Sequence, residues 1–313
     1  MKRRHARPAP PRRNAPRQFD YGPPPLGALE EFTQGSLAKW REAGRNLEQL
    51  SELLFFGLEA HRARFSGELI DAVRAAASGP RSFKGWSRLV DYQYTNQPLS
   101  MAGSVKGDGG RFNIGAALNP ATYTSFPALY AAEDFGTAFR ERFALDQDQS
   151  VGGLTASDLA LRRHNSFSQV VLDIHVESVI DVGDLPALKT IAGILGRIQM
   201  PPGIGRLARQ LRLRTPWLVR SPSALQQQLL HPNWRVNPVQ YALPANSQIF
   251  GRMCVASGVH GILYPSTRHA GRQCIALFPQ NWRETSSCVE LVGPCPPEVK
   301  VARVDGATTS KLY

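Results

Sequence analysis

The chain has 313 residues, 42% of them hydrophobic, and a formal net charge of +12. This length and apolar content allow a buried core in one large domain, or in a domain with an extension, and exclude a disordered protein. Seven basic residues and a single acidic one, Asp20, give residues 1–25 a net charge of +6, which is half of the total. The positive charge is therefore concentrated in a tail.

The sequence also argues against a membrane-spanning protein, a secreted protein and a zinc protein. No run of 18 apolar residues occurs, so no segment is expected to cross a membrane as a helix. The basic N-terminus is followed by prolines at 23–25 and not by an apolar stretch, which predicts a cytoplasmic protein without a secretory signal. The four cysteines form no C-x-x-C pair and no histidine stands at zinc-finger spacing, so no metal site is predicted.

The first 80 residues are expected to form a tail and a helical extension. Residues 1–27 combine arginine with proline, a composition that is typical of disorder. This tail is either an arm attracted to nucleic acid or an acidic partner, or a solvated segment without a specific role. In residues 28–80, leucines recur at three- and four-residue steps between Leu47 and Leu58, so two or three helices are expected to pack on the following domain.

Residues 81–300 are expected to form the main domain and residues 301–313 a C-terminal tail. The first predicted strand of the main domain is 86–90. Residues 103–143 then predict three successive elements: a turn, a strand and a helix. A glycine run at 107–110 predicts a turn that carries Arg111. An apolar run at 128–132 predicts a buried strand. Asp134 predicts a helix N-cap, which places Glu141 about two turns into that helix.

The remaining elements are shorter. A glycine break is expected at 150–153. Strands are predicted at 170–176, 261–264 and 273–278, and short helices at 185–194, at 205–213, from 221 and at 247–257.

The order and spacing of these blocks resemble the RES domain family, named for its arginine, glutamate and serine. The matching residues are 110–113 with Arg111, 129–130 with Tyr130, and 137–141 with Glu141; segments 244–248 and 261–266 lead to Ser266. The resemblance covers roughly residues 84–282. It implies an α+β fold, with a small curved mixed β core like that of the ADP-ribosyltransferases and surrounding helices.

The resemblance also implies an activity. Family members are toxins, many from toxin–antitoxin pairs, that consume NAD by phosphorolysis or hydrolysis or pass its ADP-ribose to a protein. An enzyme is therefore expected that cleaves the nicotinamide–ribose bond, with NAD as its substrate and no cofactor. The implied partners are a helix-turn-helix antitoxin that plugs the active site and a protein acceptor of ADP-ribose. No membrane is expected as a partner, and nucleic acid only through the basic tail.

Breaking this bond makes the ribose oxocarbenium-like, so the site needs a carboxylate near the ribose and cations on the pyrophosphate. The resemblance assigns Glu141 to the carboxylate, Arg111 to a forked contact with the pyrophosphate, Tyr130 to stacking on the nicotinamide or ribose, and Ser266 to further hydrogen bonds. Four more residues are expected to bind the substrate: Arg88, Ser104, Asn113 and Tyr123. Tyr123 also competes with Tyr130 for the family's tyrosine, and Tyr130 is preferred for its spacing to Glu141.

Each of these residues has a structural alternative, such as a surface ion pair for Glu141, which stands between two arginines. No G-x-S-x-G, H-E-x-x-H, P-loop or G-x-G-x-x-G motif is present. Two other functions stay open. A nucleic-acid-binding or ribonuclease-like toxin would use the tail and the arginines between 206 and 214. A RES-like scaffold without activity would only bind a partner.

Overall fold

A computed structural model describes residues 34–119, 121–143, 145 and 167–309. The predicted N-terminal tail and the predicted break at 150–153 lie outside the described residues. The chain divides into two compact units, Met1–Arg45 and Asn46–Tyr313. The fold and the site described below belong to the second unit.

The predicted helical extension consists of two helices, α1 (Gln34–Arg64) and α2 (Ser66–Ala76). Within the second unit, Leu50 and Phe55 of α1 are buried. Leu69, Ala72 and Val73 of α2 are buried in the same hydrophobic cluster as residues of α5 and α9. The second helix is therefore part of the main core and not an appendage to it.

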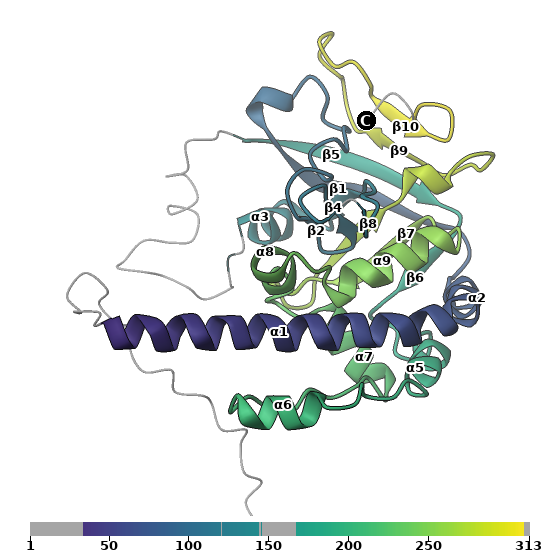
Figure 1. Cartoon of the computed structure of the whole chain (residues 1–313). Coiled ribbons are helices and arrows are strands. Elements are labelled where there is room, and N and C mark those ends of the chain that lie inside the picture. The colour runs from purple at the N-terminus through teal and green to yellow at the C-terminus, as the bar shows by residue number, and fades with distance from the viewer. Residues whose placement is uncertain (1–33, 120, 144, 146–166, 310–313) are drawn as a thin grey trace, which may run out of the picture. The chain divides into compact units, whose positions relative to one another are not determined.

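One mixed sheet of eight strands runs through the second unit, in the order β10-β9-β5-β1-β4-β8-β7-β6 (Figure 1). Only the β6–β7 pair is parallel among these neighbours. The strands are β1 (Arg81–Asp91), β4 (Leu129–Ala132), β5 (Phe167–Val176), β6 (Val179–Asp181), β7 (Gly261–Pro265), β8 (Gln273–Leu277), β9 (Cys288–Leu291) and β10 (Arg303–Asp305). Two short strands, β2 (Gly109–Gly110) and β3 (Asn113–Ile114), form a separate hairpin.

Each face of the sheet carries a hydrophobic cluster. Successive side chains of a strand point to opposite sides, so one strand contributes to both clusters. In β4, Leu129 and Ala131 pack in one cluster with Trp282, whereas Ala132 packs in the other. The cluster that contains Ala132 also includes buried residues of three helices, such as Leu69 of α2, Phe139 of α3 and Phe250 of α9. The site described below lies on this helical face.

Six further helices follow the hairpin in the described part of the chain: α3 (Phe135–Phe143), α5 (Lys189–Leu195), α6 (Ile204–Gln210), α7 (Pro222–Leu229), α8 (Val236–Tyr241) and α9 (Asn246–Ala256). The α+β class is thus confirmed. Ser221 caps α7 as its sequence predicts, with its hydroxyl accepting a hydrogen bond from the backbone N–H of Ala224 at 3.2 Å. No described helix has the length and apolar character needed to cross a membrane.

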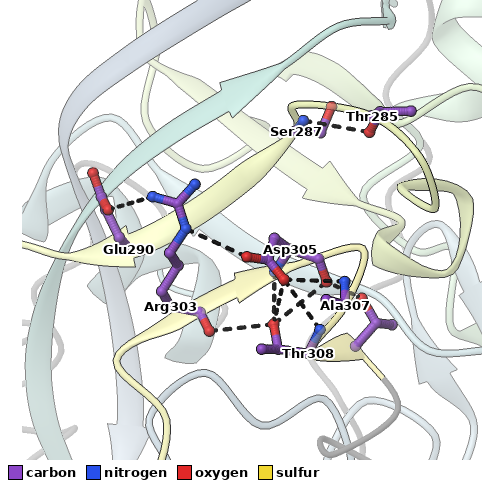
Figure 2. A network of polar contacts seen from close by, with 8 residues as sticks. Thr285, Ser287, Glu290, Arg303, Asp305, Ala307 and Thr308 are labelled. Carbon is purple, nitrogen blue, oxygen red and sulfur yellow. Dashed lines mark hydrogen bonds and ion pairs between the residues drawn. The ribbon is translucent and has the colours of Figure 1, made fainter.

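The sheet is larger than the small core expected from the sequence, since it also contains β6, β9 and β10, which the sequence analysis does not predict. Strand β10 lies in the segment 301–313 that was expected to be a tail. Arg303 of this strand pairs with Glu290 of β9 at 2.9 Å, and Asp305 accepts hydrogen bonds from Ala307 and Thr308 (Figure 2). Val304 is fully buried. Strand β10 is therefore the edge strand of the sheet next to β9.

Candidate functional site

A cavity of about 670 Å³ opens on the helical face of the sheet. Its walls come from β1, β4, α3, the β2–β3 hairpin and the segment that leads into α8. This volume is in the range of sites that hold small molecules and cofactors.

The cavity is strongly cationic. Its lining includes two carboxylates, Asp91 and Glu141, and six basic side chains, namely Arg88, Lys106, Arg111, Arg142, Arg235 and Arg268. Arg142 is paired with Asp91 at 2.5 Å. An excess of fixed positive charge in a concave, partly desolvated site favours an anionic ligand.

Arg111 stands at the tip of the β2–β3 hairpin, where Gly109 has a φ of 87° that a glycine adopts without strain. Its side chain is buried, with Nη1 donating to the backbone oxygen of His231 at 3.0 Å and Nη2 donating to Thr267 Oγ1 at 2.9 Å. In the described part of the chain, no carboxylate pairs with this guanidinium and no hydrogen bond uses its Nε. Arg111 is therefore held in place by neutral oxygens, with donor capacity left for a ligand.

Tyr130 supports this hairpin from β4. Its hydroxyl donates to Asn113 Oδ1 at 2.8 Å and accepts from the backbone N–H of Phe112 at 2.9 Å. Burial raises the pKa of the Tyr130 phenol, so the group is neutral at physiological pH. The hydroxyl is thus used in the structure, and the ring is what Tyr130 offers to the cavity that it lines.

Asn113 and Ser104 continue this network. Asn113 Nδ2 donates to the backbone oxygens of Ser104 at 2.7 Å and Phe126 at 3.0 Å, and Ser104 Oγ accepts from the backbone N–H of Ala128 at 3.0 Å. Ser104 lines the cavity, whereas Asn113 is fully buried behind it. Asn113 therefore positions the hairpin and does not reach the cavity.

Helix α9 fixes the same hairpin from the other side. The amide of Gln248 is fully buried and donates from Nε2 to the backbone oxygens of Asp108 at 2.8 Å, Gly110 at 3.1 Å and Asn113 at 3.0 Å. The sequence placed Gln248 in a block that matches the family but assigned it no role. Its only signal was its membership of that block.

Glu141 is presented by α3, whose N-terminus is capped as predicted: Asp134 Oδ1 accepts from the backbone N–H of Thr137 at 2.7 Å. Glu141 Oε1 accepts hydrogen bonds from Ser266 Oγ at 2.6 Å and from the backbone N–H of Thr267 at 3.0 Å. The loop after β7 thus orients the carboxylate. Ser266 is brought to Glu141, but it is not among the residues that line the cavity.

Arg88 lines the cavity from β1. Its guanidinium donates three hydrogen bonds of 3.0 Å, to the backbone oxygens of Pro98, Tyr130 and Ser100. Burial, together with the charge of Arg142, lowers the pKa of Arg88 to about 10, so it is still protonated at neutral pH. No described carboxylate neutralises this charge.

Tyr123 lies away from the cavity. Its ring packs edge-on against Phe55 at 5.8 Å between centroids, in a hydrophobic cluster that includes Leu243 and Ile249. It does not line the cavity, and its hydroxyl has no hydrogen-bond partner among the described residues. Tyr123 is therefore not part of the candidate site. The sequence around it does not indicate whether its ring faces the cavity or an apolar cluster.

Sequence reasoning missed the segment before α8. Arg235 lines the cavity with its guanidinium 4.5 Å from the centroid of the Trp234 ring, which lines it too. Burial and the charge of Arg111 lower the pKa of Arg235. No motif marks this segment, because its position depends on how the chain between β6 and β7 folds back over the sheet.

No group of three or more histidine, cysteine, aspartate or glutamate side chains that could hold a metal ion occurs in the described ranges. The site is built from guanidinium groups, one phenol and one oriented carboxylate.

Comparison with known proteins gives a family match. The model of the RES domain matches residues 86–238 and 193–296. Among solved structures, the MbcT–MbcA toxin–antitoxin complex of M. tuberculosis is similar at 15% sequence identity and a TM-score of 0.40, over 78% of this chain and 96% of that chain. No curated protein matches the chain.

Proposed function

Because the chain belongs to the RES domain family, we propose that it is a toxin that binds NAD in the cationic cavity and cleaves the bond between nicotinamide and ribose. NAD is the substrate of this reaction, and no further cofactor takes part. The acceptor of the ADP-ribose is phosphate, water or a protein side chain.

The observation that carries the proposal is that two guanidinium groups without a described carboxylate partner and one oriented carboxylate line the same cavity. Arg88 and Arg111 bond only neutral oxygens among the described residues. A pyrophosphate would neutralise both and accept the forked contact that a guanidinium provides. Glu141 lines the same cavity with one carboxylate oxygen held by the loop after β7.

The chemistry follows from this arrangement. When the glycosidic bond breaks, its electron pair leaves with nicotinamide, which becomes neutral, and positive charge develops on the ribose. A fixed carboxylate in a desolvated site stabilises that charge, because it needs no reorganisation as the charge appears. An acceptor oxygen then bonds the ribose carbon: water or a protein hydroxyl releases its proton to the solvent in this step, whereas an anionic phosphate oxygen has no proton to release. Glu141 supplies the carboxylate in this scheme, and the Tyr130 ring stacks on the nicotinamide or the ribose.

We propose an antitoxin with a helix-turn-helix fold as the partner, by membership of a family in which such pairs are common. An inhibitor that covers the cavity must face its basic lining, which favours acidic side chains on the inhibitor's contact surface. A protein acceptor of ADP-ribose would approach the same opening.

Purified protein incubated with NAD decides between the candidate functions. NAD cleavage predicts loss of NAD and release of free nicotinamide in equal amounts. A nucleic-acid-binding toxin or an inactive scaffold predicts that NAD stays intact. Adding phosphate to the assay identifies phosphorolysis, because the rate then rises with phosphate concentration.

A further inference from the structure

We propose that Thr267 is a positioning residue that couples Arg111 to Glu141, so that one residue sets the distance between the pyrophosphate-binding cation and the ribose-facing carboxylate. This proposal rests on the proposed cleavage of NAD. Thr267 had no role in the sequence analysis, since the last block that matches the family, 261–266, ends with the preceding serine.

Thr267 contacts both groups through different atoms. Its backbone N–H donates to Glu141 Oε1 at 3.0 Å, and its side-chain Oγ1 accepts from Arg111 Nη2 at 2.9 Å. The two groups come from distant parts of the chain, Arg111 from the β2–β3 hairpin and Glu141 from α3. In the described part of the chain, Thr267 is the residue whose hydrogen bonds reach both.

The loop that carries Thr267 is itself firmly held. Ser266 Oγ accepts from the backbone N–H of His269 at 3.0 Å, and the backbone N–H of Ser266 donates to the backbone oxygen of Arg272 at 2.8 Å. The His269 ring contacts Thr137 Oγ1 of α3 at 2.7 Å. A loop fixed to the same helix as Glu141 is a rigid platform from which a hydroxyl can orient Arg111.

The two contacts are separable by mutation. Glu141 is held by the backbone of Thr267, which every substitution except proline preserves. Arg111 is held by the side-chain hydroxyl, which valine lacks at nearly the same shape and serine retains. Loss of the hydroxyl therefore frees the Nη2 end of Arg111 and leaves the carboxylate in place.

The experiment measures the steady-state kinetics of NAD cleavage for Thr267→Val and Thr267→Ser. Thr267→Val is expected to raise KM for NAD about tenfold, the effect of one lost hydrogen bond to a charged group, and to change kcat less than about twofold. Thr267→Ser is expected to restore the parental KM. Thr215→Val, at an exposed threonine outside the cavity lining, is the matched control.

A double-mutant cycle makes the assignment specific. In an Arg111→Lys background, Thr267→Val should raise KM no further, because the bond that it deletes no longer has the same donor. An unchanged KM in Thr267→Val, or equal increases for valine and serine, overturns the proposal. So does a full additional increase in the Arg111→Lys background.

Calorimetric binding of NAD to the same variants keeps the two proposals apart. Thr267→Val should weaken NAD binding about tenfold relative to Thr267→Ser, because valine lacks the hydroxyl that serine keeps. A parent protein that binds NAD without cleaving it contradicts the proposed reaction, and the affinities of the valine and serine variants still decide the role of Thr267. A parent protein that neither binds nor cleaves NAD contradicts both.

Discussion

Replacing Glu141 by glutamine keeps the size of the side chain and an oxygen that can accept from Ser266 and Thr267, but it removes the negative charge. If this charge stabilises an oxocarbenium-like ribose, NAD binding should survive while turnover falls by about two orders of magnitude or more. The measurement is NAD loss over time at matched protein concentration. In cells where expression of the parent is toxic, Glu141→Gln should relieve the toxicity without loss of soluble protein.

Glu133 provides the matched control for this substitution. Its carboxylate is occupied by Arg272 Nη1 at 3.0 Å and by the backbone N–H of Gln273 at 3.1 Å, and it does not line the cavity. Glu133→Gln should therefore keep parental turnover. A Glu141→Gln protein as active as the parent would reject the site, and dependence on Glu133 would move the catalytic carboxylate to the start of α3.

Arg111→Lys tests the cation. Lysine carries the same charge as a single point, so it cannot bond His231 and Thr267 and still present a planar fork to a pyrophosphate. We expect KM for NAD to rise by about tenfold or more, with a smaller change in kcat. Arg283→Lys, at an arginine whose side chain is 86% exposed, should leave both constants unchanged. A parental KM in Arg111→Lys would show that another cation of the lining binds the phosphates.

For single residues of the candidate site, the sequence could predict those in the family blocks but not those outside them. Arg111, Tyr130 and Glu141 stand in blocks with a recognisable order, and the structure places all three at the cavity. Arg235 stands in no such block, and Thr267 stands just after one. They reach the site because distant segments meet there, and a linear pattern does not encode such a meeting.

At the scale of elements, the contact between α9 and the β2–β3 hairpin limits what Gly251 can become. A Cβ at this position would lie 1.9 Å from the backbone oxygen of Phe112, the neighbour of Arg111. Gly251→Ala must therefore separate the helix from the hairpin. We expect a loss of about 1–3 kcal/mol in the free energy of unfolding, measured in urea, together with a higher KM for NAD.

Gly67→Ala is the matched control in α2, where an added Cβ would meet nothing within 4 Å. Helix propensity alone then predicts a gain of up to about 1 kcal/mol. If Gly251→Ala unfolds at the same urea concentration as the parent, the close packing of α9 on the hairpin is wrong.

Long or strongly patterned elements could be read from the sequence. The strand β5 was predicted from its β-branched residues, and α3 from Asp134 and the helical residues after it. Strands β6, β9 and β10 have three or four residues each, too few for alternation to be distinctive. Strand β6 forms by pairing with β7, β9 by pairing with β5, and β10 by pairing with β9, which is information from the tertiary fold.

At the scale of the molecule, the boundary expected near residue 80 does not separate two packing units. The division falls between Arg45 and Asn46, and α2 lies within the main core. A leucine repeat predicts that a helix has an apolar face, but it does not say which surface covers that face. The composition of the N-terminal tail, in contrast, is visible in the sequence at once.

The last prediction concerns that tail. Every described residue that lines the cavity falls between Ser87 and Cys274, and a tail of arginine and proline is not expected to form a pocket wall, so removal of residues 1–25 should leave NAD turnover unchanged. A fall of more than about tenfold, or about 1.4 kcal/mol of barrier, would make the tail part of the site. The same pair of proteins tests the nucleic-acid alternative. If the tail acts as a basic arm, the full chain should bind RNA or DNA with an affinity that falls steeply with salt, and the truncated chain should lose most of that binding. Retention of salt-dependent binding after truncation would assign it instead to the exposed arginines of α6, Arg206 and Arg209.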